Sequence, residues 1–272
     1  MKYWNLKKPI NQTIMKYKSS FTILIFAITA ATFCFTFTSC TKEKKKAIVC
    51  LIDFSETPEW NSRMEMLKQV TINSIISKIS FNTSLVILPL DKASASGSEE
   101  LLSGRTLNEF DYIPDMTAPP DEDRVSQENL QKTKDSLKQE FSQLFDKALQ
   151  SRVGLQKGTD IFGALEQAKR YLPEGGQNII ILLSDMMNWS NDLKMEPGNF
   201  NTASIEQALK KVPAANLSNA KILIYTGQTG YLPADHFKTV QQFWEKYFSQ
   251  NNIQLVDYSS GAITKLEETV AH

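Results

Sequence analysis

Two short runs made up entirely of apolar residues, 47–52 and 179–183, restrict the fold of this chain strongly. A strand that is apolar on both faces is typical of a parallel sheet covered by helices on both sides. In open sheets of this kind the carboxyl ends of neighbouring strands meet at one edge, where ligands bind. Asp53 and Asp185 follow the two runs closely. We therefore expect these aspartates to lie close together.

The remaining chain alternates helical and strand-like patterns. Helical spacing of apolar residues occurs in 60–79, 127–150, 161–172, 204–211 and 237–248, and further strand-like runs cover 85–88, 220–225 and 253–258. This alternation predicts an α/β fold with a doubly wound, mostly parallel sheet flanked by helices. The irregular insertion at 91–125 has room for a short antiparallel edge strand near Leu101 or Tyr112, but its pattern is too weak to place one.

The first 39 residues have the pattern of a secretory signal. Five lysines and no acidic residue precede the uncharged apolar stretch 21–37, and Thr38-Ser39-Cys40 follows it. A basic region, an apolar region and small residues at the cleavage site are typical of such signals. The pattern resembles a bacterial lipoprotein signal, in which Cys40 would be lipidated and become the new N-terminus. An uncut membrane anchor is the alternative, although the stretch is at the short limit for a span.

This signal implies a protein anchored by lipid in the bacterial cell envelope, outside the cytoplasm. Thr41, rather than Asp, after Cys40 favours the outer membrane by the rule of that family, and the basic segment 40–46 would be a tether beside the lipid. Without the five signal lysines, 25 basic residues face 30 acidic ones, a net charge of −5. Nucleic-acid binders carry clustered positive charge, so a nucleic-acid partner is not expected.

Five residues could bring oxygen ligands to the carboxyl edge of the sheet. Asp53, Ser55 and Thr57 follow the first strand, Thr159 precedes a helical pattern, and Asp185 follows a later strand. Carboxylates and hydroxyls are hard oxygen donors that suit a small hard cation such as Mg²⁺. Taken singly, Thr57 and Thr159 could equally be helix N-caps, and the aspartates could simply end strands.

These residues together resemble the metal-ion-dependent adhesion site of the von Willebrand type A (vWA) domain family. The family's first motif is an Asp, a Ser two residues later and a Ser or Thr two further on, matched by Asp53, Ser55 and Thr57. Its loop threonine and its second aspartate are matched by Thr159 and Asp185. The resemblance implies direct coordination of Mg²⁺ or Mn²⁺ by Ser55 and by Thr57 or, alternatively, Thr159. The two aspartates would act mostly through bridging waters.

The resemblance covers 47–261 and implies a vWA-like domain over 47–262, followed by a tail at 263–272. It departs from the family at Met186, because glycine usually follows the second aspartate. The function it implies is a membrane-tethered protein-binding module, not an enzyme, in which the cation binds an acidic side chain of a partner protein.

The loop after Asp185 is expected to select the partner, since any exposed carboxylate could complete the metal site. Trp189 and Met187 are large apolar side chains in a polar loop, and Tyr231 lies in a loop expected beside it. Trp is enriched at interface hot spots, and Met adapts to varied surfaces. One of the methionines could instead pack beneath the edge of the sheet.

Two alternatives to a metal-dependent binding module remain open. A Mg²⁺-dependent phosphohydrolase would use Asp53 as its nucleophile, but such enzymes need a second carboxylate where Ser55 stands. A structural domain could also retain the fold after losing the metal. A catalytic triad is not expected, because His236 and His272 are the only histidines and neither is near a strand end. His236 is expected on a helix surface.

Overall fold

The computed structural model describes residues 45–92, 94, 100–107, 122–152, 158–217, 219–227 and 229–272. All of them belong to the second of two compact units, Lys44–His272. The expected signal, Cys40 and Tyr112 lie outside the described residues.

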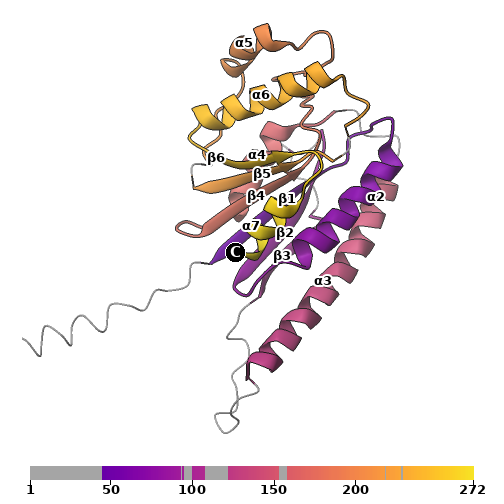
Figure 1. Ribbon diagram of the computed structural model, residues 1–272, viewed down its shortest axis with the longest axis vertical. Coiled ribbons are helices and arrows are strands. Elements are labelled where there is room, and N and C mark those ends of the chain that lie inside the picture. Colours follow the sequence, from indigo (N-terminus) through magenta and orange to yellow (C-terminus); the bar gives the residue numbers. More distant parts are fainter. Residues whose placement is uncertain are drawn as a thin grey trace, which may run out of the picture. The chain divides into compact units, whose positions relative to one another are not determined.

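A six-stranded sheet in the order β3-β2-β1-β4-β5-β6 forms the centre of the domain (Figure 1). Its strands are β1 (Lys46–Asp53), β2 (Thr83–Leu90), β3 (Leu102–Leu107), β4 (Gln177–Leu183), β5 (Ala220–Tyr225) and β6 (Gln254–Ser259). Every strand runs parallel to its neighbours except β3, which pairs antiparallel with β2. The doubly wound α/β fold is therefore confirmed, and the edge strand lies near Leu101, one of the two positions considered.

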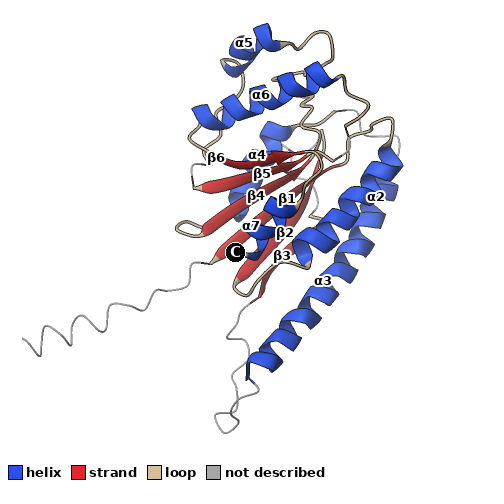
Figure 2. Cartoon of the chain, in the orientation of Figure 1, coloured by secondary structure: helices blue, strands red, loops and turns tan. Residues whose placement is uncertain are grey.

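Helices cover both faces of the sheet (Figure 2). They are α2 (Trp60–Val70) with the π-helical turn η1 (Thr71–Ile76), α3 (Glu122–Arg152), α4 (Ile161–Ala168) with η4 (Lys169–Tyr171), η5 (Thr202–Ser204) with α5 (Ile205–Leu209), α6 (Ala234–Gln250) and α7 (Thr264–Ala271). Side chains of α2, α3 and α7 pack in the hydrophobic cluster on one face, and those of α4, α5 and α6 pack in the cluster on the other.

Strand β1 shows why an uninterrupted apolar run was needed. Ile48, Cys50 and Ile52 belong to the first cluster, and the intervening Val49 and Leu51 belong to the second. Because successive side chains of a strand point to opposite faces, both sets are buried only when both faces are covered. The two clusters lie wholly within Lys44–His272, so this unit contains a complete core of its own.

The C-terminal residues 263–272 are not a tail separate from the domain. Residues Thr264–Ala271 form α7, whose Leu266 and Val270 are buried in the first cluster. The expectation was wrong because only two apolar residues of this short segment are buried, too few to make a helical pattern clear. Among the described residues, no helix has both the length and the apolar character needed to cross a membrane.

Candidate functional site

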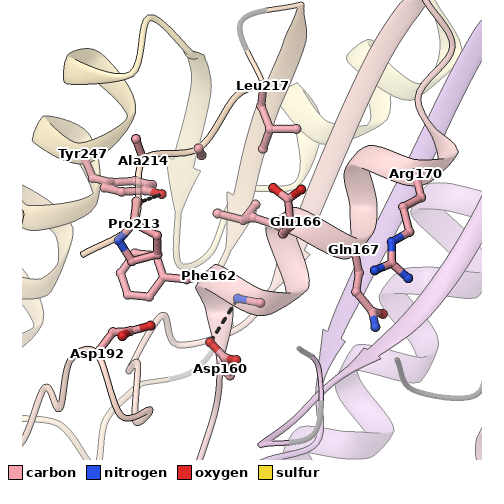
Figure 3. A pocket seen from close by; sticks show the side chains of 13 residues that line it. Asp160, Phe162, Glu166, Gln167, Arg170, Asp192, Pro213, Ala214, Leu217 and Tyr247 are labelled. Atoms are coloured by element: carbon pink, nitrogen blue, oxygen red, sulfur yellow. Dashed lines mark hydrogen bonds between the residues drawn. The ribbon is translucent and has the colours of Figure 1, made fainter. Parts of the chain in front are cut away.

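A pocket of about 370 Å³ lies between α4 and the segment 213–217, with Tyr247 of α6 on its wall (Figure 3). Asp160 lines it and caps α4 by accepting a hydrogen bond from the Gly163 N–H at 3.0 Å. Burial, together with the nearby carboxylate of Asp192, raises the pKa of Asp160, although the bond from Gly163 opposes this shift. None of the five expected metal ligands lines this pocket.

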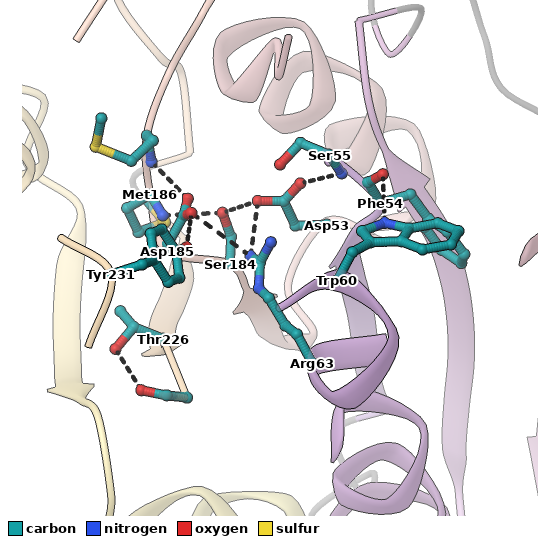
Figure 4. Close-up of polar contacts among 12 residues, drawn as sticks. Asp53, Phe54, Ser55, Trp60, Arg63, Ser184, Asp185, Met186, Thr226 and Tyr231 are labelled. Carbon is teal, nitrogen blue, oxygen red and sulfur yellow. Dashed lines mark hydrogen bonds and ion pairs between the residues drawn. The ribbon is translucent and has the colours of Figure 1, made fainter. Parts of the chain in front are cut away.

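The two aspartates meet at the carboxyl edge of the sheet (Figure 4). Strands β1 and β4 are parallel neighbours with Ile52 opposite Leu183, so Asp53 and Asp185 extend from the same end. Both are buried. They lie close together, as expected from the parallel pairing.

Both oxygens of Asp53 accept hydrogen bonds. Oδ1 accepts from the backbone N–H of Ser55 at 2.8 Å. Oδ2 accepts from the Ser184 hydroxyl at 2.7 Å and from Nη2 of Arg63 at 3.1 Å. The Asp53 carboxylate is thus held in one orientation by three donors.

Asp185 is held in a similar way. Its Oδ1 accepts from the Met187 N–H at 3.0 Å, and its Oδ2 accepts from the Tyr231 hydroxyl. Burial raises the pKa of Asp185; the charge of Arg63 opposes this rise and the charge of Asp53 adds to it. Tyr231, which we expected beside Trp189, is therefore a partner of the carboxylate pair.

Arg63 is the residue of the site that the sequence analysis missed. It lies in the first turn of α2, and its side chain is 3% exposed. Its Nη2 is 3.1 Å from Asp53 and 3.9 Å from Asp185. Burial opposes its charged form, but the two carboxylates outweigh this effect and raise its pKa. The available signal was its spacing, because Arg63 lies three residues after Trp60 and four before Leu67 on the apolar stripe of the helix.

The three expected hydroxyl ligands differ in their surroundings. Ser55 is half-buried. The Oγ1 atom of Thr57 is buried and has no hydrogen-bond partner within the described part of the chain. Thr159 is buried, and its carbonyl accepts from the Trp189 N–H at 2.8 Å, which joins the Thr159 loop to the loop after Asp185. Burying a hydroxyl without a hydrogen-bond partner costs free energy. The Thr57 oxygen is therefore still available to bind a ligand.

The loop after Asp185 combines buried and exposed apolar side chains. Met186 is fully buried and Met187 is half-buried against the core, as the alternative reading of the methionines allowed. Trp189 is 46% exposed, and Nζ of Lys194 lies 5.6 Å from the centre of its ring. The loop is joined to the start of α4, because the side-chain oxygen of Asn188 accepts a hydrogen bond from the Ile161 N–H at 3.0 Å.

Gly158 allows the close approach of this loop. Its φ is +115°, and a Cβ atom there would lie 3.0 Å from the Trp189 carbonyl oxygen.

His236, expected on a helix surface, is instead buried, with Nε2 at 3.2 Å from the Met195 carbonyl. This expectation was wrong because α6 also covers the segment after Asp185.

The donor set at the carboxylate edge suits a hard cation. It offers the two carboxylates of Asp53 and Asp185, and the buried hydroxyl of Thr57, four residues after Asp53, has no hydrogen-bond partner among the described residues. No group of three or more His, Cys, Asp or Glu side chains that could hold a metal occurs among the described residues. The expected site does not need such a group, since it has only two acidic residues. The two carboxylates are thus of the kind that Mg²⁺ prefers, while in this structure their charge faces the guanidinium of Arg63.

No protein-family model matches this chain. No curated protein matches it either. Among solved structures, the chain is similar to one described as von Willebrand factor type A from Catenulispora acidiphila, with 13% sequence identity and a TM-score of 0.44. The match covers 84% of this chain but 42% of that protein, so this chain spans less than half of its length. The α/β fold is established here by the strand order and the two helical layers.

Proposed function

We propose that this protein is a binding module that recognises an acidic side chain of another protein through a divalent cation, Mg²⁺ or Mn²⁺. The observation that carries the proposal is the convergence of Asp53 and Asp185 on a single cationic atom, Nη2 of Arg63. A position within reach of both carboxylates thus already favours positive charge. The vWA resemblance of the motif residues supports the same reading.

In this proposal Ser55, with Thr57 or Thr159, would hold the cation directly, while Asp53 and Asp185 would supply the balancing charge. The bound cation would offer an electrophilic position to a carboxylate of the partner. The Met187 N–H and the Tyr231 hydroxyl both donate to Asp185, and the exposed indole of Trp189 in the same loop as Met187 is suited to direct contact with a partner.

An enzymatic role for Asp53 has less support. A nucleophilic carboxylate must reach the substrate, but Asp53 is fully buried and both of its oxygens accept hydrogen bonds. Ser55 also stands where a phosphohydrolase would need an acid/base carboxylate. The geometry therefore favours binding over phosphoryl transfer.

The metal part of the proposal is tested by titrating Mn²⁺ into the domain Lys44–His272 in a calorimeter. We expect binding at one site, with loss of binding in Asp53→Asn and weaker binding in Thr57→Val. Thr57→Val should not destabilise the fold, because it removes a buried hydroxyl that lacks a partner. Thr202→Val, at an exposed position, is the control. Equal binding by the wild type and Asp53→Asn would contradict the proposal.

The partner part is tested by affinity capture from native membranes with and without a chelator. Trp189→Ala should lower capture roughly tenfold or more while leaving Mn²⁺ affinity unchanged, as expected of a central interface residue. If Trp189→Ala captured the partner as well as the wild type while Asp53→Asn did not, the role of the loop would be wrong and the metal site alone would remain.

A further inference from the structure

Arg63 reaches the carboxylate pair from a different element than any expected ligand. Helix α2 follows β1, and the Trp60 indole near its start donates to the Phe54 carbonyl at 3.4 Å. Three residues later in α2, the Arg63 side chain extends toward Asp53 and Asp185 (Figure 4). It is buried there, with only 3% of its side chain exposed.

The guanidinium is only partly used in this position. Nη2 contacts both carboxylates, whereas Nε and Nη1 are buried and have no hydrogen-bond partner in the described ranges. Stable structural arginine–carboxylate pairs commonly use two parallel N–H···O bonds. Arg63 instead interacts with the carboxylates mainly through its charge. Because its Nε and Nη1 atoms form no hydrogen bonds with the other described residues, few bonds would be broken if the side chain moved away from the aspartates.

The charges of the cluster do not balance while Arg63 is the only cation. Asp53 and Asp185 together carry two negative charges when ionised, and Arg63 supplies one positive charge. A divalent cation would match the pair fully. The guanidinium and a metal ion could not share the position, because like charges about 4 Å apart in a buried site repel strongly.

We propose that Arg63 is a built-in competitor of the divalent cation. Its guanidinium offsets part of the negative charge of the Asp53–Asp185 pair in the metal-free domain and must leave this pair when the cation binds. The inference rests on the metal site of the proposed function and adds a residue that keeps the metal affinity low. The positive charge of Arg63 would also explain how the two carboxylates can lie close together when no metal ion is bound.

The test compares Mn²⁺ binding by the wild-type domain and by Arg63→Met, a change that keeps much of the side-chain length but removes the charge. Arg63→Met should bind Mn²⁺ at least about tenfold more tightly, because the competing charge is gone. Mn²⁺ should also raise its Tm more than that of the wild type, since the metal-free variant buries two uncompensated carboxylates. Lys68→Met is the matched control, because it removes a positive charge from the same helix at a site paired with Asp146.

A measurement on the wild type avoids any dependence on how well the variant folds. In the ¹⁵N-labelled domain, the Nε–H signal of Arg63 should shift as Mg²⁺ saturates the site, whereas that of Arg152 should not. Equal Mn²⁺ affinities of wild type and Arg63→Met, or an Arg63 signal that stays unchanged at saturation, would overturn the competition and leave the metal site standing. Absence of binding in every variant would overturn the metal site and the competition together.

Discussion

Met186 occupies a backbone conformation that residues with a side chain seldom adopt. Its φ is +65°, in the left-handed region that favours glycine. Three contacts hold it there: its N–H donates to Ser184 Oγ at 2.9 Å, its carbonyl accepts from the Trp244 indole at 2.8 Å, and its side chain is fully buried. Packing therefore explains how a residue with a side chain is accommodated here, since burial of this side chain offsets the cost of the left-handed backbone.

We predict that Met186→Gly is more stable than Met186→Ala, although glycine leaves the larger cavity. Both changes remove a buried side chain, at a cost of about 2–5 kcal/mol. Glycine alone also removes the left-handed strain, which is worth roughly 1 kcal/mol. Urea unfolding should thus show a smaller loss for Met186→Gly.

Met64 is the matched control for this comparison. It is fully buried too, but it lies in the interior of α2, where glycine is about 1 kcal/mol worse than alanine. The order of the two variants should therefore be reversed at Met64. The same order at both positions would contradict the role given to the Met186 backbone.

At the scale of elements, α7 is joined to the sheet by Lys46 at the start of β1. Nζ of Lys46 donates to the carbonyls of Thr269 and Val270, at 3.0 Å and 2.6 Å, near the C-terminal end of α7. Burial, with a smaller effect of nearby Lys221, lowers the pKa of Lys46 to about 8. A neutral amine still has two hydrogens, enough for both carbonyls.

This lowered pKa predicts how stability changes with pH. Between about pH 8 and the ordinary lysine pKa of 10.5, the unfolded chain holds a proton on Lys46 that the folded domain has lost. Unfolding therefore takes up a proton in this window, and raising the pH favours the folded state. Relative to Lys46→Met, the wild type should gain stability from pH 8 to pH 10 in urea unfolding. Lys221→Met, which removes only the smaller effect on Lys46, is the control. A constant difference between wild type and Lys46→Met would contradict the assignment.

At the scale of the whole molecule, the carboxylate edge and the proposed anchor belong to different units of the chain. The site lies in Lys44–His272, whereas Cys40 lies in the unit Met1–Glu43. We therefore expect the proposed metal binding and the proposed membrane attachment to be separable, so that a variant can lose one and keep the other.

We predict that Cys40 carries lipid and that Cys40→Ser yields a soluble or unprocessed protein. Firm attachment needs more than one acyl chain, as a lipoprotein anchor provides. Mass spectrometry of the membrane fraction should show a lipidated N-terminus at Cys40, and Cys34→Ser should leave it unchanged. An intact, unlipidated N-terminus at Met1 or Met15 would refute the processing.

The sequence alone determined the layered α/β fold and the meeting of Asp53 with Asp185. Both follow from local patterns, because an apolar run such as 179–183 is stable only between two helical layers. Parallel strands must also bring their carboxyl ends together. The burial of Cys50 follows from the same pattern, because Cys50 lies within the apolar run 47–52.

Only the tertiary structure decided which groups surround the aspartates. The position of Arg63 depends on how α2 is rotated against the sheet, and the Tyr231 contact depends on how a distant loop folds back over β4. Burial of His236 and packing of α7 likewise depend on elements far away in the chain. Periodicity reports which face of a segment is buried, but the neighbour that covers this face, and the charge it brings, are set by packing between segments.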